Sequence, residues 1–219
     1  MEGSFKKNIL IETWVVWAIT MASVVLGQVF LKKYSSLIVP LALIYIPLGL
    51  SIIKKTPVTF LETTPSRIYQ SLKSLLVFSL ILFPLIFLVY HLFLSGLGFK
   101  YMGYKGKTDL FAVYYIHLLT AAFPEEFFFR GYLQEKWNLL SDKGISVFGV
   151  KISFWALLCC LVFALSHSLV AYRPWHVLIF FPALCFTWLK EKTGGILAPA
   201  LFHAACNTFS HWAGWSYFK

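Results

Sequence analysis

The chain has 219 residues, of which 59% are hydrophobic, 19% aromatic and only 13% charged. Soluble domains average about 25% charged residues, so this composition excludes an ordinary soluble protein and indicates an integral membrane protein that crosses the bilayer several times. The net charge of +10 does not indicate nucleic-acid binding, because the Lys and Arg residues stand between apolar runs, as juxtamembrane charges do, and form no basic stripe.

Seven apolar segments, each bounded by charges, Gly or Pro, are candidate transmembrane helices. The first follows Lys6 and Lys7 as a signal sequence would, but its run to about Leu31 is too long for a signal core, so we predict a retained helix. The fold class predicted is all-α, a polytopic transmembrane bundle of about seven helices. The segments are approximately 9–31, 37–53, 74–94, 110–136, 152–172, 175–190 and 196–215.

Two connecting segments interrupt the apolar runs. Residues 54–73 are polar and contain prolines, which predicts a loop or an interfacial stretch, and residues 96–106 form a glycine-rich connector. No internal repeat and no soluble domain is visible. The cysteines all stand within apolar runs without a CxxC spacing, so we expect buried small hydrophobic side chains rather than a zinc site or a disulfide. They are Cys159, Cys160, Cys185 and Cys206.

The fourth segment contains three charged residues that a membrane helix rarely carries. A charge at the bilayer centre costs on the order of 3 kcal/mol, so such residues mark functional sites. Glu126 and Arg130 are four residues apart and are expected to pair on one helix face. Glu125 is rotated by about 100° from Glu126 and has no local partner. Pro124 removes the helical donor for the carbonyl of Thr120, which predicts a kink beside a protein-lined or water-filled cavity.

Two later segments each place a histidine four positions from a second residue on the same helix face. Phe163 and His167 share a face in the fifth segment, and His203 and Asn207 share a face in the seventh. A lone intramembrane His or Asn is usually an interhelical hydrogen-bonding residue. Leaving several of them unpaired in hydrocarbon would cost several kcal/mol each, so we expect them to converge with Glu125 inside the bundle.

These residues form three motifs whose order and approximate spacing resemble those of the CPBP (CAAX protease and bacteriocin-processing) family of intramembrane proteases. The resemblance covers about residues 115–210. Each motif alone is weak, whereas three in order on predicted helices are specific. The motifs are Glu125-Glu126-x-x-x-Arg130, Phe163-x-x-x-His167 and His203-x-x-x-Asn207.

The resemblance implies a helical membrane bundle around a water-accessible cavity and a glutamate-type endopeptidase. It implies that Glu125 is the general base and that His167 positions the attacking water or shares its proton. His203 and Asn207 are implied to donate hydrogen bonds to the developing oxyanion. No serine or cysteine nucleophile is expected.

The resemblance also bears on the supporting residues and the domain organisation. Glu126 and Arg130 are expected to support the site, although Glu126 could share the role of base. We predict one membrane-embedded protease domain over residues 1–219, with a motif-bearing core at about 110–215 and accessory N-terminal helices over 1–95. No cofactor is expected.

A mechanistic alternative has Glu125, His167 and His203 hold a divalent metal such as zinc, although they come from separate helices without an HExxH pair. Two further alternatives are a non-catalytic membrane scaffold or immunity-type protein of the same fold, and a proton-coupled transporter, against which the lack of repeated halves argues.

The expected partners are the lipid bilayer and a membrane-anchored protein or peptide substrate, with no nucleic acid. The expected location is a prokaryotic cell membrane, because the chain is compact and its loops are short. The substrate class stays open among prenylated tails, bacteriocin leaders and C-terminal sorting tails, and the membrane orientation and oligomeric state stay open as well.

Overall fold

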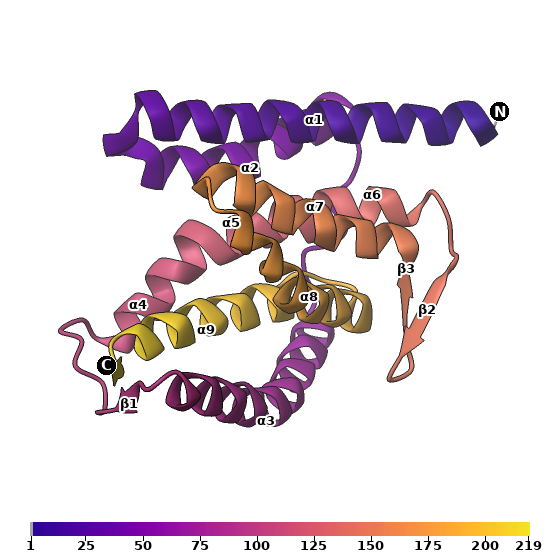
Figure 1. The fold of residues 1–219 in the computed structure, drawn as a ribbon. Coiled ribbons are helices and arrows are strands. Elements are labelled where there is room, and N and C mark those ends of the chain that lie inside the picture. Colours follow the sequence, from indigo (N-terminus) through magenta and orange to yellow (C-terminus); the bar gives the residue numbers. More distant parts are fainter. Residues whose placement is uncertain (1) are drawn as a thin grey trace.

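A computed structural model describes residues 2–219, and most of this chain is helical (Figure 1). Helices occupy all seven of the segments that the sequence predicts. They are α1 (Glu2–Phe30), α2 (Ser35–Ile53), α3 (Pro65–Gly96), the continuous helix formed by α4 (Leu110–His117), α5 (Phe123–Glu126) and α6 (Glu135–Asn138) with their linking turns, α7 (Phe154–Ala171), α8 (Phe180–Thr193) and α9 (Leu197–Gly214). Short 3-10 turns at Lys32–Tyr34 and Pro174–Ile179 precede α2 and α8.

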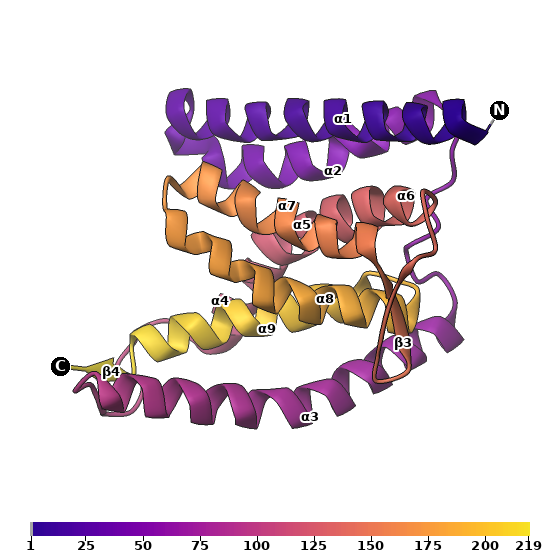
Figure 2. The ribbon, with the colours of Figure 1, turned by 45° about the vertical axis from the view of Figure 1, so that its right-hand side comes forward.

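The helices that carry the three motifs lie in the middle of the molecule. In both ribbon views the antiparallel pair α1 and α2 covers one side and α3 covers the opposite side (Figures 1 and 2). The continuous helix over 110–138 lies between these two sides together with α7, α8 and α9. The N-terminal helices therefore enclose the segment that contains the motifs.

Four helices are long and apolar enough to cross a membrane, namely Gly3–Phe30, Lys32–Ile53, Pro65–Gly96 and Phe154–Ala171. Many of their large apolar side chains, such as Leu80 and Ile81 of α3, are exposed at the surface, as expected for helices that face lipid. The other three predicted spans are helical but do not meet the same criterion. The motif residues explain part of this, because they place charged and polar groups in otherwise apolar helices.

The continuous helix over 110–138 departs from α geometry on both sides of Pro124. Residues Leu118–Ala122 and Phe127–Gln134 are π-helical, and the N–H of Phe123 bonds to the carbonyl of Leu118 five residues earlier. Such wide turns are rare and often occur at functional sites. They are the local adjustment of the backbone that accompanies the proline, and the kink expected at Pro124 stays a prediction.

Two small antiparallel ladders accompany the helices and are not predicted by the sequence. β2 (Gly144–Val147) pairs with β3 (Val150–Ser153), and the turn residues Phe148 and Gly149 both have positive φ, as a tight two-residue hairpin requires. β1 (Lys100–Tyr101) pairs with β4 (Tyr217–Phe218), which brings the C-terminal end of the chain back to the end of α3. The predicted all-α class is correct for the bulk of the fold.

The buried core is aromatic and is centred on the motif helices. Its largest fully buried side chains come from the helix over 110–138 and from α7, α8 and α9, among them Phe128, Phe129, Trp137, Phe163, Phe186 and Phe202. The indole N–H of Trp137 donates to Thr13 of α1, at 2.8 Å, which fixes the N-terminal helix to this core. The four cysteines are free. Cys159 and Cys160 are buried as the sequence predicts, whereas Cys185 and Cys206 are only half-buried, so the prediction is wrong for these two.

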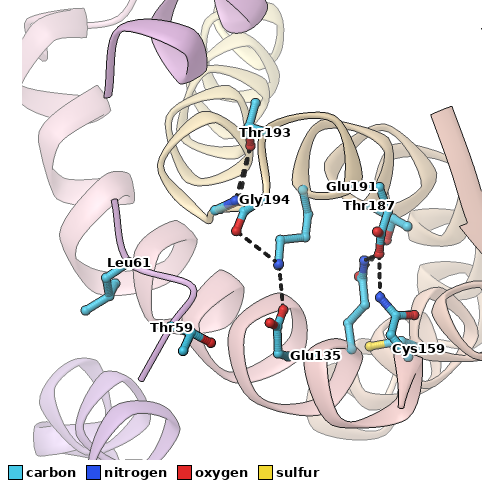
Figure 3. Close-up of polar contacts among 12 residues, drawn as sticks. Thr59, Leu61, Glu135, Cys159, Thr187, Glu191, Thr193 and Gly194 are labelled. Carbon is cyan, nitrogen blue, oxygen red and sulfur yellow. Dashed lines mark hydrogen bonds and ion pairs between the residues drawn. The ribbon is translucent and has the colours of Figure 1, made fainter. Parts of the chain in front are cut away.

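A layer of polar contacts joins α8 to the end of the continuous helix. The ammonium of Lys190 lies 2.7 Å from Glu135 and 3.4 Å from the carbonyl of Gly194, and Figure 3 shows Glu135 facing the turn at Gly194. Glu191 accepts hydrogen bonds from Gln134 and Asn138, both at 2.7 Å. These contacts hold α8 and the start of α9 against the first motif helix.

Candidate active site

Glu125 is the point at which the three motifs meet. Its Oε2 atom lies 3.4 Å from Nε2 of His167 on α7 and 3.7 Å from Nε2 of His203 on α9. All three side chains are mostly buried, with His203 the most enclosed. The convergence that the sequence predicts for these residues is therefore present.

Glu126 makes a different set of contacts, because it points away from Glu125 into the protein. Its Oε2 lies 3.2 Å from Nε of Arg130, and both side chains are 0% exposed. The two atoms are not aligned as a hydrogen bond, so the contact is an ion pair. This confirms the predicted pair. Arg130 also donates to the carbonyl of Ala183 on α8, at 3.2 Å.

The second oxygen of Glu126 links the first motif to the third. Its Oε1 lies 2.9 Å from Nδ1 of His203. Glu126 therefore contacts a guanidinium with one oxygen and an imidazole with the other. The sequence predicts only the first of these contacts, because the second joins residues 77 positions apart.

Two aromatic rings enclose the cationic and imidazole groups. The ring of Phe163 lies 4.2 Å from the guanidinium carbon of Arg130 and 4.4 Å from the ring of His167. The ring of Phe186 stacks on His203, with centroids 4.5 Å apart and an angle of 16°. Such contacts favour cations over the ring faces and limit the orientations of the imidazoles. No sequence signal distinguishes Phe186 from the other apolar residues of α8.

The hydrogen bonds of the two imidazoles determine which nitrogen faces Glu125. Nδ1 of His167 lies 3.0 Å from the carbonyl of Phe163, and because a carbonyl only accepts, this nitrogen carries a hydrogen. Nδ1 of His203 lies against the carboxylate of Glu126 and carries a hydrogen for the same reason. Both rings therefore present Nε2 to Glu125, where a proton can be exchanged.

Asn207 lies one helical turn beyond His203 on α9 and is half-buried. Within residues 2–219 its side chain makes no hydrogen bond and remains available to a ligand. Its predicted role as an oxyanion donor stays a prediction.

The metal alternative requires Glu125, His167 and His203 to form a coordination site. Among residues 2–219 no group of three or more His, Cys, Asp or Glu side chains is arranged so that it could hold a metal ion.

The start of α9 is held by two residues that the sequence does not single out. Glu62, in the segment between α2 and α3, accepts from the backbone N–H of Leu197 at 3.1 Å. Arg67 donates to the carbonyl of Gly194 at 3.0 Å. A Cβ at Gly195 would lie 2.0 Å from the Glu62 carboxylate, so this glycine makes the contact possible. Glu62 and Leu197 are 135 positions apart, and no local pattern relates them.

A cavity of about 180 Å³ adjoins the motif residues. Glu125 and His167 line it together with apolar residues of α1 and α2. The predicted cavity beside the first motif is therefore present. Its complete lining comprises Met21, Val24, Gln28, Val39, Leu43, Glu125, Phe129, Ser166, His167, Val170, Ala171 and His176.

Comparison with known families gives a match for the segment that contains this site. Residues 107–209 match the family model described as type II CAAX prenyl endopeptidase Rce1-like. All three motifs lie inside the matched segment, whereas α1, α2 and α3 lie outside it. No curated protein and no solved structure gave a match.

Proposed function

The chain belongs, through residues 107–209, to the Rce1-like type II CAAX prenyl endopeptidase family, and we propose that it is an intramembrane endopeptidase that hydrolyses a peptide bond of a membrane-associated protein or peptide. The observation that carries this proposal is the position of Glu125 between the Nε2 atoms of two imidazoles at the edge of a cavity. Four helices suited to crossing a membrane support an intramembrane location.

In the proposed reaction Glu125 is the general base. It takes a proton from a water molecule as the water oxygen forms a bond to the scissile carbonyl carbon and the carbonyl electron pair moves onto its oxygen. His167 supports this step, because its Nε2 faces Glu125 and can share the proton. When the C–N bond breaks, the proton passes to the departing amine nitrogen, which balances the hydrolysis. Such proton transfer contributes about 10²–10⁴-fold to a rate.

We assign His203 and Asn207 to the developing oxyanion. Nδ1 of His203 donates to Glu126, so a hydrogen on Nε2 as well requires a cationic ring. The negative charge of the Glu126 carboxylate balances the positive charge of that ring. With Glu125 ionised, the site then holds two carboxylates against one guanidinium and one imidazolium, which leaves it neutral overall. A preorganised donor of this kind contributes on the order of 3 kcal/mol.

The same geometry suggests different roles for the two parts of the chain. We assign catalysis to the motif-bearing core at about 110–215, and enclosure of the site to the accessory helices over 1–95. Glu126 and Arg130 act as supporting residues, because both are fully buried and neither lines the cavity. The proposed setting is a prokaryotic cell membrane, with a membrane-anchored protein or peptide as substrate.

The test compares cells that express the wild-type protein with cells that express Glu125→Gln, by mass spectrometry of membrane-protein termini. New termini present only with wild type are expected and would identify the substrate. Asp142→Asn, in an exposed loop outside the site, is the matched control and should yield the wild-type termini. Identical termini for wild type and Glu125→Gln, at equal expression, would contradict the proposed activity.

A further inference from the structure

His176 places a buried nitrogen without a hydrogen-bond partner in the cavity that Glu125 lines. Its Nδ1 atom is enclosed by protein and forms no hydrogen bond within residues 2–219. The same side chain lines the cavity together with Glu125 and His167. Buried polar atoms nearly always have a partner, so Nδ1 indicates a group that binds in the cavity. His176 lies outside the three motifs, and the reaction proposed for Glu125 and His167 does not use it.

The cavity is small enough for His176 and Glu125 to reach the same peptide bond. A sphere with its volume of about 180 Å³ is about 7 Å across, which is less than the length of two peptide units of about 3.8 Å each. A peptide bond bound in the cavity is therefore within reach of both side chains. Gln28, two residues before the end of α1, also lines the cavity. This polar lining allows the cavity to hold water beside the two titratable groups.

The second ring nitrogen of His176 is open to the outside of the protein. The side chain is half-buried, and Nε2 is neither enclosed nor hydrogen-bonded within residues 2–219. His176 follows the last residue of α7, a helix suited to crossing a membrane, by five positions. In this turn Tyr172 and Trp175 are exposed, and the guanidinium of Arg173 lies 5.9 Å from the Trp175 ring. Exposed aromatic and basic residues at a helix end are typical of the membrane–water interface, so Nε2 is placed to meet water.

The turn that carries His176 is fixed to the end of α7 by its backbone. The N–H of Arg173 donates to the carbonyl of Ser168 at 3.2 Å, and the N–H of His176 donates to the carbonyl of Arg173 at 3.1 Å. Pro174 begins the 3-10 turn that contains His176. The imidazole is therefore held between the cavity on one side and the membrane surface on the other.

We propose that His176 is a catalytic residue, the general acid that donates its Nδ1 hydrogen to the departing amine nitrogen and exchanges protons with water at the membrane surface through Nε2. The inference rests on the proposed function, in which Glu125 is the base. Hydrolysis of an amide needs a proton on the nitrogen as the C–N bond breaks, and imidazole is the side chain that most often exchanges protons near neutral pH. Oε2 of Glu125 lies between the Nε2 atoms of His167 and His203, whereas Nδ1 of His176 has no competing partner within residues 2–219.

The proton transfers through His176 balance over one turnover. The ring begins in its neutral form with a hydrogen on Nδ1, and Nε2 takes a proton from water at the membrane surface. Nδ1 then donates its hydrogen to the amine nitrogen, while the electron pair of the C–N bond moves onto that nitrogen and the oxyanion re-forms the carbonyl of the acid product. Afterwards Nδ1 takes the proton that Glu125 removed from the attacking water, and Nε2 releases its proton to the surface. Both side chains return to their starting forms.

The test separates proton donation from other roles of His176 by changing the leaving group. Two synthetic peptides span the bond found cleaved in cells, one with the natural amide and one with a thioester at that bond. A thiolate leaves without a proton, because thiols ionise with a pKa of about 8.5, whereas an amine does not. His176→Asn keeps a hydrogen-bond donor near the position of Nδ1 but cannot release its proton. His91→Asn is the matched control, because Nδ1 of His91 lies 2.9 Å from the Tyr217 hydroxyl and does not line the cavity.

With the amide peptide, His176→Asn should lower kcat by about 10²-fold, whereas with the thioester peptide its kcat should stay within about threefold of wild type. Glu125→Gln should lose turnover of both peptides, because both bonds require an activated water. His91→Asn should behave as wild type on both. Thermal unfolding in detergent checks that each variant is folded, and His176→Gln is measured in place of His176→Asn if the latter does not fold.

Two results would overturn the inference and leave the proposed peptidase function standing. The first is wild-type turnover of the amide peptide by a folded His176 variant, which would show that the amine takes its proton from another group. The second is an equal loss on the amide and the thioester, which would show that the ring binds or positions the peptide instead. A third result, no cleavage by wild type of any membrane protein in cells, would remove the proposed function and this inference together.

Discussion

His203 and Glu126 form the contact that joins the third motif to the first, with Nδ1 of the histidine 2.9 Å from Oε1 of the glutamate. This contact separates the two adjacent glutamates by environment. Glu126 is fully buried between Arg130 and His203, whereas Glu125 reaches the cavity. Glu126 therefore joins the first and third motifs, while Glu125 lines the cavity.

Arg130→Ala is expected to destabilise the protein by about 3–5 kcal/mol, because it leaves the buried Glu126 carboxylate without its cation. Thermal or denaturant unfolding in detergent measures the change. Arg130→Lys is the graded comparison, since it keeps the charge but loses the planar contact with Phe163. Its free energy of unfolding should lie between those of wild type and Arg130→Ala. Wild-type stability in Arg130→Ala would show that the Glu126–Arg130 pair contributes nothing to the free energy of unfolding.

Asn207→Ala is expected to lower kcat by about 10²–10³-fold, which is the typical effect of removing one oxyanion donor. Its free energy of unfolding should change by less than about 0.5 kcal/mol, because the side chain makes no hydrogen bond within residues 2–219. Steady-state kinetics and unfolding are measured on the same preparation. An unchanged kcat would remove Asn207 from the proposed mechanism.

Gly195→Ala should lower both stability and turnover, because the added Cβ displaces the Glu62 carboxylate from the N–H of Leu197 at the start of α9. Loss of that contact leaves a partly buried donor unpaired and costs about 1 kcal/mol. Gly49→Ala on α2 is the control, since a Cβ there meets no neighbouring atom within 4 Å. Equal behaviour of the two variants would show that this contact does not position α9.

Removal of metal ions tests the metal-free form of the reaction. Cleavage is expected to continue at the wild-type rate after treatment with a strong chelator such as 1,10-phenanthroline, because Glu125 and His167 are proposed to activate water directly. The measurement is the rate before and after treatment, and again after zinc is added back. Loss of activity that zinc restores would favour the alternative in which Glu125, His167 and His203 hold the metal.

Much of the fold is predictable from the sequence, because apolar length and i, i+4 spacing are local properties. The seven helical segments and the Glu126–Arg130 pair are of this kind, and the structure confirms both. The convergence of Glu125, His167 and His203 is also predictable, since buried polar groups require partners and the chain offers few.

Other features depend on contacts between distant residues, which spacing alone does not reveal. The bond between Glu62 and Leu197, the stacking of Phe186 on His203 and the wall that Val24 contributes to the cavity are of this kind. The π-helical turns around Pro124 and the β2–β3 hairpin depend on local backbone choices that the apolar pattern does not distinguish.

The most direct test of the central claim compares purified wild type with Glu125→Gln, on the substrate identified from cells. Gln keeps the size of the side chain and much of its hydrogen bonding but cannot act as a base. The account predicts a loss of at least about 10²-fold in kcat, with a free energy of unfolding within about 1 kcal/mol of wild type. Turnover within threefold of wild type would show that Glu125 is not the base.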